Sequence, residues 1–157
     1  MNIRKATIKD ADVLAANQVH MALESENIIL DHQTVLVGTC AYLEDENRGT
    51  AYIAEIKGEV AASLLVTREW SDWRNAWIWW IQSVYTVPKF RRMGIYKALY
   101  NHLQELVKKS EDVIGIRLYV ARNNPRAIEP YRRLGMTDEH YTTFEWLRDP
   151  DTFKPAE

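Results

Sequence analysis

Two arginines and a glycine stand where an expected strand gives way to an expected helix, an arrangement that can bind an anion. The segment reads Val87-Pro-Lys-Phe-Arg-Arg-Met-Gly94, and the helix is expected from Ile95. A helix start offers unpaired backbone N–H groups at the positive end of the helix dipole, and arginine forms charge-assisted hydrogen bonds with phosphate oxygens. The loop therefore predicts a phosphate site. Because Arg-x-x-Gly is a short pattern, a solvated basic turn is the alternative interpretation.

A second candidate motif begins about thirty residues after that loop. Asn124 follows an expected strand and precedes Pro125, a pair that suits the cap and first position of a helix. Tyr131 lies seven residues after Asn124, about two turns further along the same helix. Gly135 is expected to end this helix.

Together, the two motifs resemble those of the GNAT superfamily of N-acetyltransferases. The segment 84–100 is similar to the acetyl-CoA motif of that family, whose phosphate loop has the form Gln/Arg-x-x-Gly-x-Gly/Ala. The segment 113–136 resembles the distal motif. Its matching positions are Asn124, Ala127, Tyr131, Gly135 and Met136. The resemblance covers nearly the whole chain, and two motifs in the family's order and spacing are more specific than either alone.

The resemblance implies acetyl-CoA as the co-substrate. In such enzymes the strand that ends here at Pro88 and the strand that ends near Val120 splay apart, and unpaired backbone groups bind the pantetheine amides. A backbone N–H of the splayed strand would stabilise the thioester oxygen as it becomes negative. The implied cofactor-binding residues are Val84, Tyr85, Thr86, Arg91, Arg92, Met93, Gly94, Ile95, Tyr96, Lys97, Asn124, Ala127 and Tyr131.

By the same resemblance, Tyr131 protonates or hydrogen-bonds the leaving thiolate, and Asn124 binds the pantetheine arm or orders the start of its helix. Three residues depart from the family pattern. Tyr96 replaces the second small residue of the phosphate loop, Arg92 stands where glycine is usual, and Pro130 removes one hydrogen bond inside the short helix. We expect a bulkier phosphate loop and a kink that changes the direction of Tyr131.

No single residue stands out as the group that accepts the amine proton. The expected central strand carries Gln82 and Ser83 but neither glutamate nor histidine before Thr86. Glu24 and Glu26 lie near the junction of the first two expected helices, which in the family borders the acceptor pocket, so they are the predicted catalytic bases. The alternative is that both are surface carboxylates and that the proton passes to solvent through waters.

Five of the six tryptophans lie within eleven residues, from Trp70 to Trp80. Strand alternation places Trp77 and Trp79 on one face of a sheet and Trp80 on the other. Indole faces attract a cationic amine, and a nearby carboxylate pairs with it. The predicted acceptor-pocket residues are Trp70, Asp72, Trp73 and Trp79. Packing in the hydrophobic core is the alternative role of these indoles.

Hydrophobic periodicity and turn residues predict the elements that position these groups. Helices are expected over about 9–24, 32–44, 95–109 and 125–134. Strands are expected over about 3–6, 50–56, 59–68, 77–87, 113–120 and 140–146. Thr7 and Asp10 resemble a capping box, Asp31 is expected to cap the second helix, and Lys57-Gly58 has the form of a hairpin turn.

This order of elements predicts an α/β (α+β) fold of the GNAT type, with a mixed, mainly antiparallel central sheet flanked by helices. The helix at 95–109 is expected to cross between two parallel strands, because such strands need a long connection. A chain of 157 residues is expected to form a single domain over 1–148, with a loose C-terminal tail over 149–157.

Composition limits the partners. Twenty lysines and arginines against 22 aspartates and glutamates leave a net charge of −2, which argues against a nucleic-acid partner. The longest apolar run, 76–81, is far shorter than the roughly 20 residues of a membrane span, and no leader segment is evident. With one cysteine, Cys40, and scattered histidines, we expect neither a disulfide nor a metal site. We expect a cytoplasmic location.

The sequence therefore predicts an N-acetyltransferase that moves an acetyl group from acetyl-CoA to a primary amine by direct attack in a ternary complex. No covalent intermediate is expected, because Cys40 lies away from both motifs. The acceptor is either a small-molecule amine or a peptide amine, and a homodimer is compatible with the resemblance. The alternative is a noncatalytic CoA-binding or protein-interaction module on the same fold.

Overall fold

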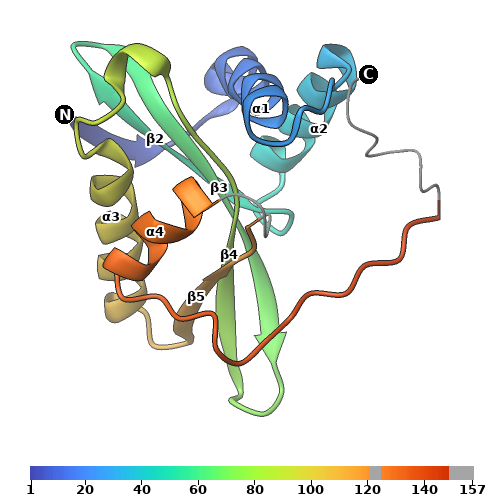
Figure 1. Ribbon diagram of the computed structural model, residues 1–157, viewed down its shortest axis with the longest axis vertical. Coiled ribbons are helices and arrows are strands. Elements are labelled where there is room, and N and C mark those ends of the chain that lie inside the picture. The colour runs from blue at the N-terminus through green and yellow to red at the C-terminus, as the bar shows by residue number, and fades with distance from the viewer. Residues whose placement is uncertain (121–124, 149–157) are drawn as a thin grey trace.

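Five strands form one sheet that separates two groups of helices (Figure 1). The computed structural model describes residues 1–120 and 125–148, and of residues 125–127 it describes only the backbone. The strands are β1 (Asn2–Lys5), β2 (Thr50–Ile56), β3 (Glu59–Ser71), β4 (Ala76–Thr86) and β5 (Val113–Leu118). The helices are α1 (Ala11–Glu26), α2 (His32–Glu44), α3 (Ile95–Lys109) and α4 (Pro125–Arg133), with short 3-10 turns at Ile8–Asp10 and Pro88–Phe90.

The sheet follows chain order, with antiparallel pairs from β1 to β4 and a parallel pair between β4 and β5. The connection between the two parallel strands runs through α3, as parallel pairing requires. Lys57 and Gly58 join β2 to β3 with φ values of 52° and 80°, which are typical of a two-residue hairpin turn. The predicted mixed sheet, its crossover and this hairpin are confirmed.

Successive residues of a strand pack against helices on opposite faces of the sheet. Ala54 of β2 lies in a core cluster with Leu103 of α3, whereas its neighbour Ile53 packs with Leu14 of α1. Leu134, which follows α4, also packs against the α3 cluster. Helices α1 and α2 therefore cover one face of the sheet, and α3 and α4 cover the other (Figure 1).

Local capping contacts fix where the first two helices begin. The Asp10 carboxylate accepts a hydrogen bond from the backbone N–H of Thr7 at 2.7 Å, which completes the predicted capping box. Because Ile8–Asp10 forms a 3-10 turn, α1 itself starts at Ala11, two residues after the predicted start. Asp31 accepts a 2.7 Å hydrogen bond from the backbone N–H of Thr34, which confirms its predicted role as the cap of α2.

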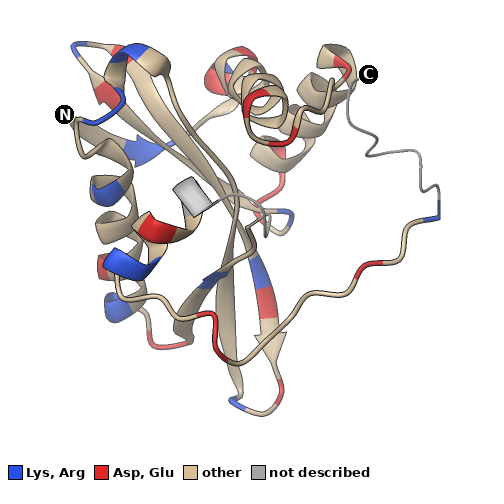
Figure 2. Cartoon of the chain, in the orientation of Figure 1, with Lys and Arg blue, Asp and Glu red and all other residues tan. Residues whose placement is uncertain are grey.

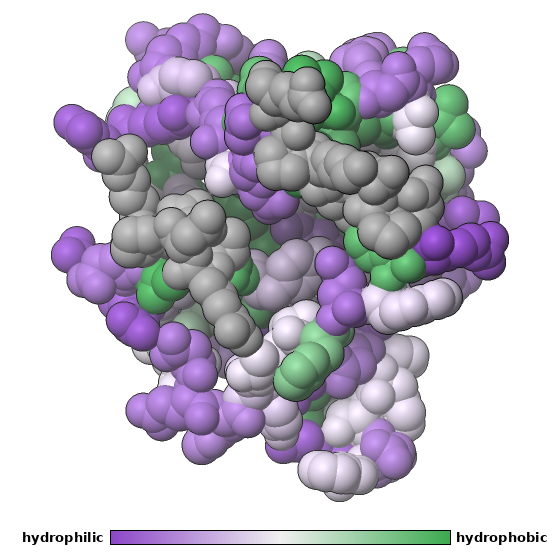
Figure 3. Space-filling view, turned by 45° about the vertical axis from the view of Figure 1, so that its right-hand side comes forward, coloured by the Kyte–Doolittle hydropathy of each residue, from purple (hydrophilic) through white to green (hydrophobic). Residues whose placement is uncertain are grey.

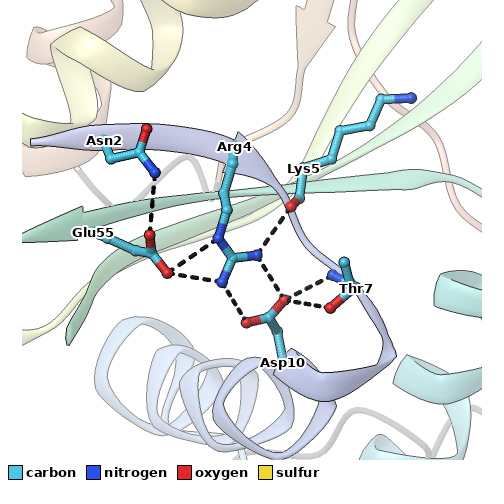
Figure 4. A network of polar contacts seen from close by, with 6 residues as sticks. All are labelled: Asn2, Arg4, Lys5, Thr7, Asp10 and Glu55. Carbon is cyan, nitrogen blue, oxygen red and sulfur yellow. Dashed lines mark hydrogen bonds and ion pairs between the residues drawn. The ribbon is translucent and has the colours of Figure 1, made fainter. Parts of the chain in front are cut away.

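Arg4 of β1 ties this strand to the start of α1 and to β2 (Figure 4). Its guanidinium forms two 2.9 Å hydrogen bonds with the Asp10 carboxylate and bonds of 3.1 and 2.7 Å with one oxygen of Glu55. A 3.1 Å bond to the carbonyl of Lys5 adds a further partner, so all three guanidinium nitrogens donate. Hydrogen bonding by Arg4 outweighs burial and lowers the pKa of Asp10 to about 2.

The strand expected over residues 140–146 is wrong. This segment has no regular secondary structure, and its aromatic side chains Tyr141, Phe144 and Trp146 are all exposed. Aromatic residues favour a strand only where a neighbouring strand supplies hydrogen bonds and packing, and no strand in the described part of the chain pairs with this segment. In Figure 1 the chain after α4 instead runs across the lower end of β4 and β5 and then away from α3 and α4.

Candidate functional site

The loop between β4 and α3 has a backbone geometry suited to an anion. Arg92 and Gly94 have φ values of 64° and 72°, so the loop turns twice through the left-handed region. Gly94 is the N-cap residue of α3, and no side chain caps this helix. The first N–H groups of α3 thus lack acceptors within the helix and lie at the positive end of its dipole.

Most of the predicted cofactor-binding residues occupy neighbouring parts of the chain at one end of β4. Three of them, Val84, Tyr85 and Thr86, form the end of β4, and the run 91–97 makes up the loop and the first turn of α3. Asn124 and the side chain of Ala127 lie outside the described residues. The strand end, the loop and the helix start therefore form one continuous part of the candidate site.

Strand β4 continues for five residues beyond its pairing with β5. The last paired residues are Ile81 of β4 and Leu118 of β5, whereas β4 ends at Thr86. On its other edge β4 stays paired with β3 as far as Thr86, opposite Ala62. Within the described residues, the β5-side backbone groups of 82–86 therefore have no strand partner. This open edge is the predicted divergence of the two strands, and it leads directly into the loop.

Glu24, predicted as a catalytic base, contacts the predicted cofactor loop. Its carboxylate accepts a 2.7 Å hydrogen bond from the Tyr85 hydroxyl and forms an ion pair with the Arg91 guanidinium. Arg91 also donates from Nε to the Thr86 carbonyl at 3.0 Å, and its guanidinium carbon lies 5.4 Å from the centre of the Tyr85 ring. The end of α1, the end of β4 and the loop are thus joined by one set of contacts.

These contacts decide the protonation of both partners. Burial disfavours the ionised carboxylate of Glu24, but the hydrogen bonds from Tyr85 and Arg91 outweigh burial, so the pKa of Glu24 is lowered. Burial and the adjacent Glu24 carboxylate raise the pKa of Tyr85 to about 12. At neutral pH, Glu24 is therefore negative and Tyr85 is neutral. Because its pKa is lowered, Glu24 is a weak proton acceptor.

A pair of tyrosines links α3 to α4. The rings of Tyr96 and Tyr131 meet edge to face, with their centres 5.8 Å apart. Burial raises the pKa of Tyr131, so its hydroxyl stays protonated and able to donate at neutral pH. Tyr96, which replaces a small residue of the family pattern, packs against the core cluster that includes Leu99. Its bulk is thus accommodated between the two helices.

Two buried donors on the α3 side of the sheet lack acceptors among the described residues. Tyr96 Oη and Trp79 Nε1 are buried and have no hydrogen-bond partner among the described residues. Both side chains pack against the same core cluster on the α3 side of the sheet. A buried donor without a partner costs free energy, so a polar ligand that reaches this region gains by supplying acceptors. The donors present fit a ligand that carries carbonyl oxygens.

The four predicted acceptor-pocket residues are not brought together. Trp70, Asp72 and Trp73 lie at or beside the turn between β3 and β4, where Trp73 is 85% exposed and Trp70 packs edge to face on Trp77 at 5.0 Å. Trp79, by contrast, packs against the core on the α3 side. The turn lies at the opposite end of β4 from the loop that follows Thr86.

Sequence reasoning missed a polar and aromatic cluster on the sheet face opposite α3. Arg117 forms a 2.9 Å ion pair with Glu69 and lies over the Trp80 ring, and Tyr119 donates a 2.8 Å hydrogen bond to Gln82. Strand alternation held the signal, because residues 116 and 118 pack in the core and so direct 117 and 119 to the other face.

Glu26, the second predicted base, lies near this cluster. Burial raises the pKa of Tyr119, and the negative charges of Glu26 and Glu145 raise it further. Glu24 and Glu26 therefore face different partners, since Glu24 contacts Tyr85 and Arg91. The two residues, equivalent in the sequence, are no longer equivalent in the structure.

The described surface is mixed in character. Figure 2 shows basic and acidic residues interspersed along the elements, including α3 and α4, and in Figure 3 hydrophobic side chains lie in separate groups among hydrophilic ones. Among the described residues no cluster of three or more His, Cys, Asp or Glu side chains is placed to hold a metal ion. None of the helices in residues 1–120 and 125–148 has the length and apolar character of a membrane span.

Comparison with known proteins places these motifs in a family. The model of the Acetyltransferase (GNAT) family matches residues 17–136, which include the end of β4, the loop and α4. No protein with a curated functional description matches the chain.

Solved structures show the same fold. A protein from Clostridium difficile 630, described as a possible acetyltransferase, is 36% identical with a TM-score of 0.88 over 93% of this chain and 96% of that one. A predicted acetyltransferase with acetyl-CoA from Clostridium acetobutylicum is 20% identical, with a TM-score of 0.72 over 92% and 95%. An aminoglycoside acetyltransferase from an uncultured soil metagenome, in complex with sisomicin, is 13% identical, with a TM-score of 0.73 over 94% and 96%. From the family match and the first of these similarities, the chain belongs to the GNAT acetyltransferase family.

Proposed function

We propose that this protein transfers an acetyl group from acetyl-CoA to a primary amine by direct attack in a ternary complex. The observation that carries the proposal is the junction of the open β4 edge with an uncapped helix start that Arg91 adjoins. The functional residues span Glu24 to Tyr131, which supports a single domain over 1–148 with 149–157 as a tail.

The cofactor would be held by groups of two kinds. Backbone groups at Val84, Tyr85 and Thr86 suit the amides of a pantetheine arm, and the N–H groups at the start of α3 with Arg91 and Arg92 suit a diphosphate. The buried donors Tyr96 Oη and Trp79 Nε1 support a polar ligand in this part of the fold. Acetyl-CoA supplies the chemistry of an activated thioester when bound.

Tyr131 is the proposed general acid. Its hydroxyl stays protonated because burial raises its pKa, so Oη holds a proton that can be given to a departing thiolate. For the amine proton, the lowered pKa of Glu24 favours the other proposed acceptors, Glu26 or water. Glu24 is then assigned a binding role, which is developed below.

A small-molecule or peptide amine is the proposed acceptor. Structural neighbours include the aminoglycoside acetyltransferase and a ribosomal-protein-alanine N-acetyltransferase from Brucella melitensis, which act on different kinds of molecule. The carboxylate of Glu26 near Tyr119, together with Trp80, supports recognition of a cationic amine on the sheet face opposite α3. On this proposal, the acceptor and the cofactor approach from opposite faces of the sheet.

The first experiment is a thermal melt of the purified protein with excess acetyl-CoA and, as a control, with excess ATP. Ligand at about 100 times its Kd stabilises the fold by about 2.7 kcal/mol, which raises Tm by several degrees, and the proposal expects this shift with acetyl-CoA and not with ATP. A panel of amines is then screened for release of free CoA thiol. Binding of acetyl-CoA without thiol release from any amine would favour the noncatalytic CoA-binding module instead.

A further inference from the structure

Glu24 binds the guanidinium of Arg91, and the diphosphate proposed for this site would bind the same guanidinium. Arg91 pairs with the Glu24 carboxylate and donates from Nε to the Thr86 carbonyl at 3.0 Å. The residue predicted to bind phosphate is therefore partly occupied by a carboxylate of the chain itself.

This ion pair is suited to exchange. The side chains of Arg91 and Glu24 are 44% and 41% exposed, and pairs that are exposed to this degree are weak. A guanidinium binds phosphate oxygens through two parallel hydrogen bonds, which is a stronger arrangement than the single bond made with Glu24. A diphosphate at the start of α3 is thus able to take Arg91 from the carboxylate.

Glu24 keeps a partner when Arg91 leaves. The Tyr85 hydroxyl donates to its other carboxylate oxygen at 2.7 Å, and Tyr85 is buried in β4. His20, one α1 turn before Glu24, packs against Tyr85, with the two ring centres 6.0 Å apart. The carboxylate therefore stays in place on α1, but without its strongest cation.

We propose that Glu24 is a positioning residue. It pairs with Arg91 while the cofactor site is empty, and Arg91 exchanges this carboxylate for the diphosphate when the cofactor binds. This inference rests on the proposed function, because it takes acetyl-CoA as the ligand. Glu24 then competes with the cofactor for Arg91. Once released, the carboxylate at the end of α1 is free to attract a cationic amine.

The test is a double-mutant cycle on acetyl-CoA affinity, measured by isothermal titration calorimetry with the whole protein. Glu24→Gln keeps the shape and the acceptor oxygen for Tyr85 but removes the competing charge. We expect this variant to lower the Kd for acetyl-CoA about fivefold, which corresponds to the upper range for an exposed ion pair. Arg91→Gln weakens binding, and in that background Glu24→Gln has no effect.

Glu59→Gln is the matched control, because Glu59 pairs with Lys89 in the same connection between β4 and α3. This variant removes one acidic charge near the loop without touching Arg91, and it leaves the affinity within about twofold. Arg91→Ala replaces Arg91→Gln in the cycle if a thermal melt shows that the glutamine variant is unfolded, because alanine also removes the cation that pairs with Glu24.

Two results overturn the inference while the proposed function stands. One is wild-type binding of acetyl-CoA that Glu24→Gln leaves unchanged or weakens. The other is equal tightening by Glu24→Gln with and without Arg91, which would show a general effect of charge. If the wild-type protein does not bind acetyl-CoA, the proposed function fails and this inference fails with it.

Discussion

Two arginines bridge separate elements of this fold, and they do so in opposite ways. Arg4 donates from all three nitrogens to Asp10, Glu55 and a carbonyl, and its two carboxylates are 10% and 19% exposed. Arg91 pairs with a single carboxylate that is 41% exposed, and its Nε donates to one backbone carbonyl. The first network is closed, whereas the second has room for another anion.

The difference shows how the same side chain serves stability in one region and binding in another. At Arg4 two carboxylates saturate the guanidinium, so an added ligand would have to break part-buried hydrogen bonds. At Arg91 a ligand replaces one exposed bond and gains the unpaired N–H groups at the start of α3. An arginine in an exposed ion pair beside an uncapped helix is thus the signal that separates the proposed binding site from a structural corner.

The largest expected effect comes from breaking each network in turn. Arg4→Gln leaves the Asp10 carboxylate buried without its cation and is expected to lower the free energy of unfolding by about 3 kcal/mol. Arg91→Gln, made at an exposed pair, is expected to cost less than about 0.5 kcal/mol. Urea denaturation at pH 7 measures both. Equal losses would remove the distinction between a closed and an open network.

A second prediction tests whether catalysis belongs to the Arg91 side of the fold. Tyr131→Phe removes the proposed acid and is expected to lower kcat about 100-fold, with the Kd for acetyl-CoA within about twofold of the wild-type value. Thiol release measures kcat, and calorimetry measures Kd. Arg4→Gln, assayed where it is folded, should keep the wild-type kcat. Unchanged turnover in Tyr131→Phe would exclude this tyrosine as the acid.

Acid unfolding should depend on the closed network. The pKa of Asp10 is about 2 in the folded protein, below the ordinary value of 3.8, so protonation favours the unfolded chain as pH falls. Asp10 therefore contributes on the order of 2 kcal/mol above about pH 5, and this contribution is lost progressively from pH 5 to pH 2.

Asp10→Asn should remove that pH dependence while keeping an oxygen for the cap at Thr7. Unfolding free energies from urea titrations at pH 7, 5 and 3 should fall less steeply for this variant than for the wild type. Glu24→Gln, at a half-exposed carboxylate, should change the slope little. If the unfolding free energy of Asp10→Asn falls with pH as steeply as that of the wild type, the Arg4 network is not the source of acid sensitivity.

The sequence predicted the parts of the fold that local signals encode. The capping residues Asp10 and Asp31, the turn at Lys57-Gly58 and the opposite faces of Trp79 and Trp80 are all confirmed, since each depends on spacing of a few residues. The mixed sheet followed from the resemblance and from the crossover helix. The caps, the turn and the strand alternation depend on residues that are close together in the sequence.

Features that depend on distant partners were not predictable in the same way. The strand over 140–146 was wrong because propensity does not supply a neighbouring strand. Glu24 and Arg91 are separated by 67 positions in the sequence. Only the packing of α1 on the end of β4 reveals that Glu24, a predicted base, contacts Arg91, which is predicted to bind phosphate. The roles assigned to Asn124 and Tyr131 stay predictions.

The smallest expected effect concerns strain beside Arg91. Arg92 has a φ of 64°, a left-handed conformation that costs about 1 to 2 kcal/mol for a residue with a Cβ, while glycine loses more chain entropy on folding. Arg92→Gly should therefore stabilise the fold by about 0.5 kcal/mol relative to Arg92→Ala, which removes the same charge but keeps the strain. Urea denaturation measures this difference. If both variants also weaken acetyl-CoA binding equally, the guanidinium of Arg92 contributes to the cofactor site; if glycine alone weakens it, the rigid turn matters more than the charge.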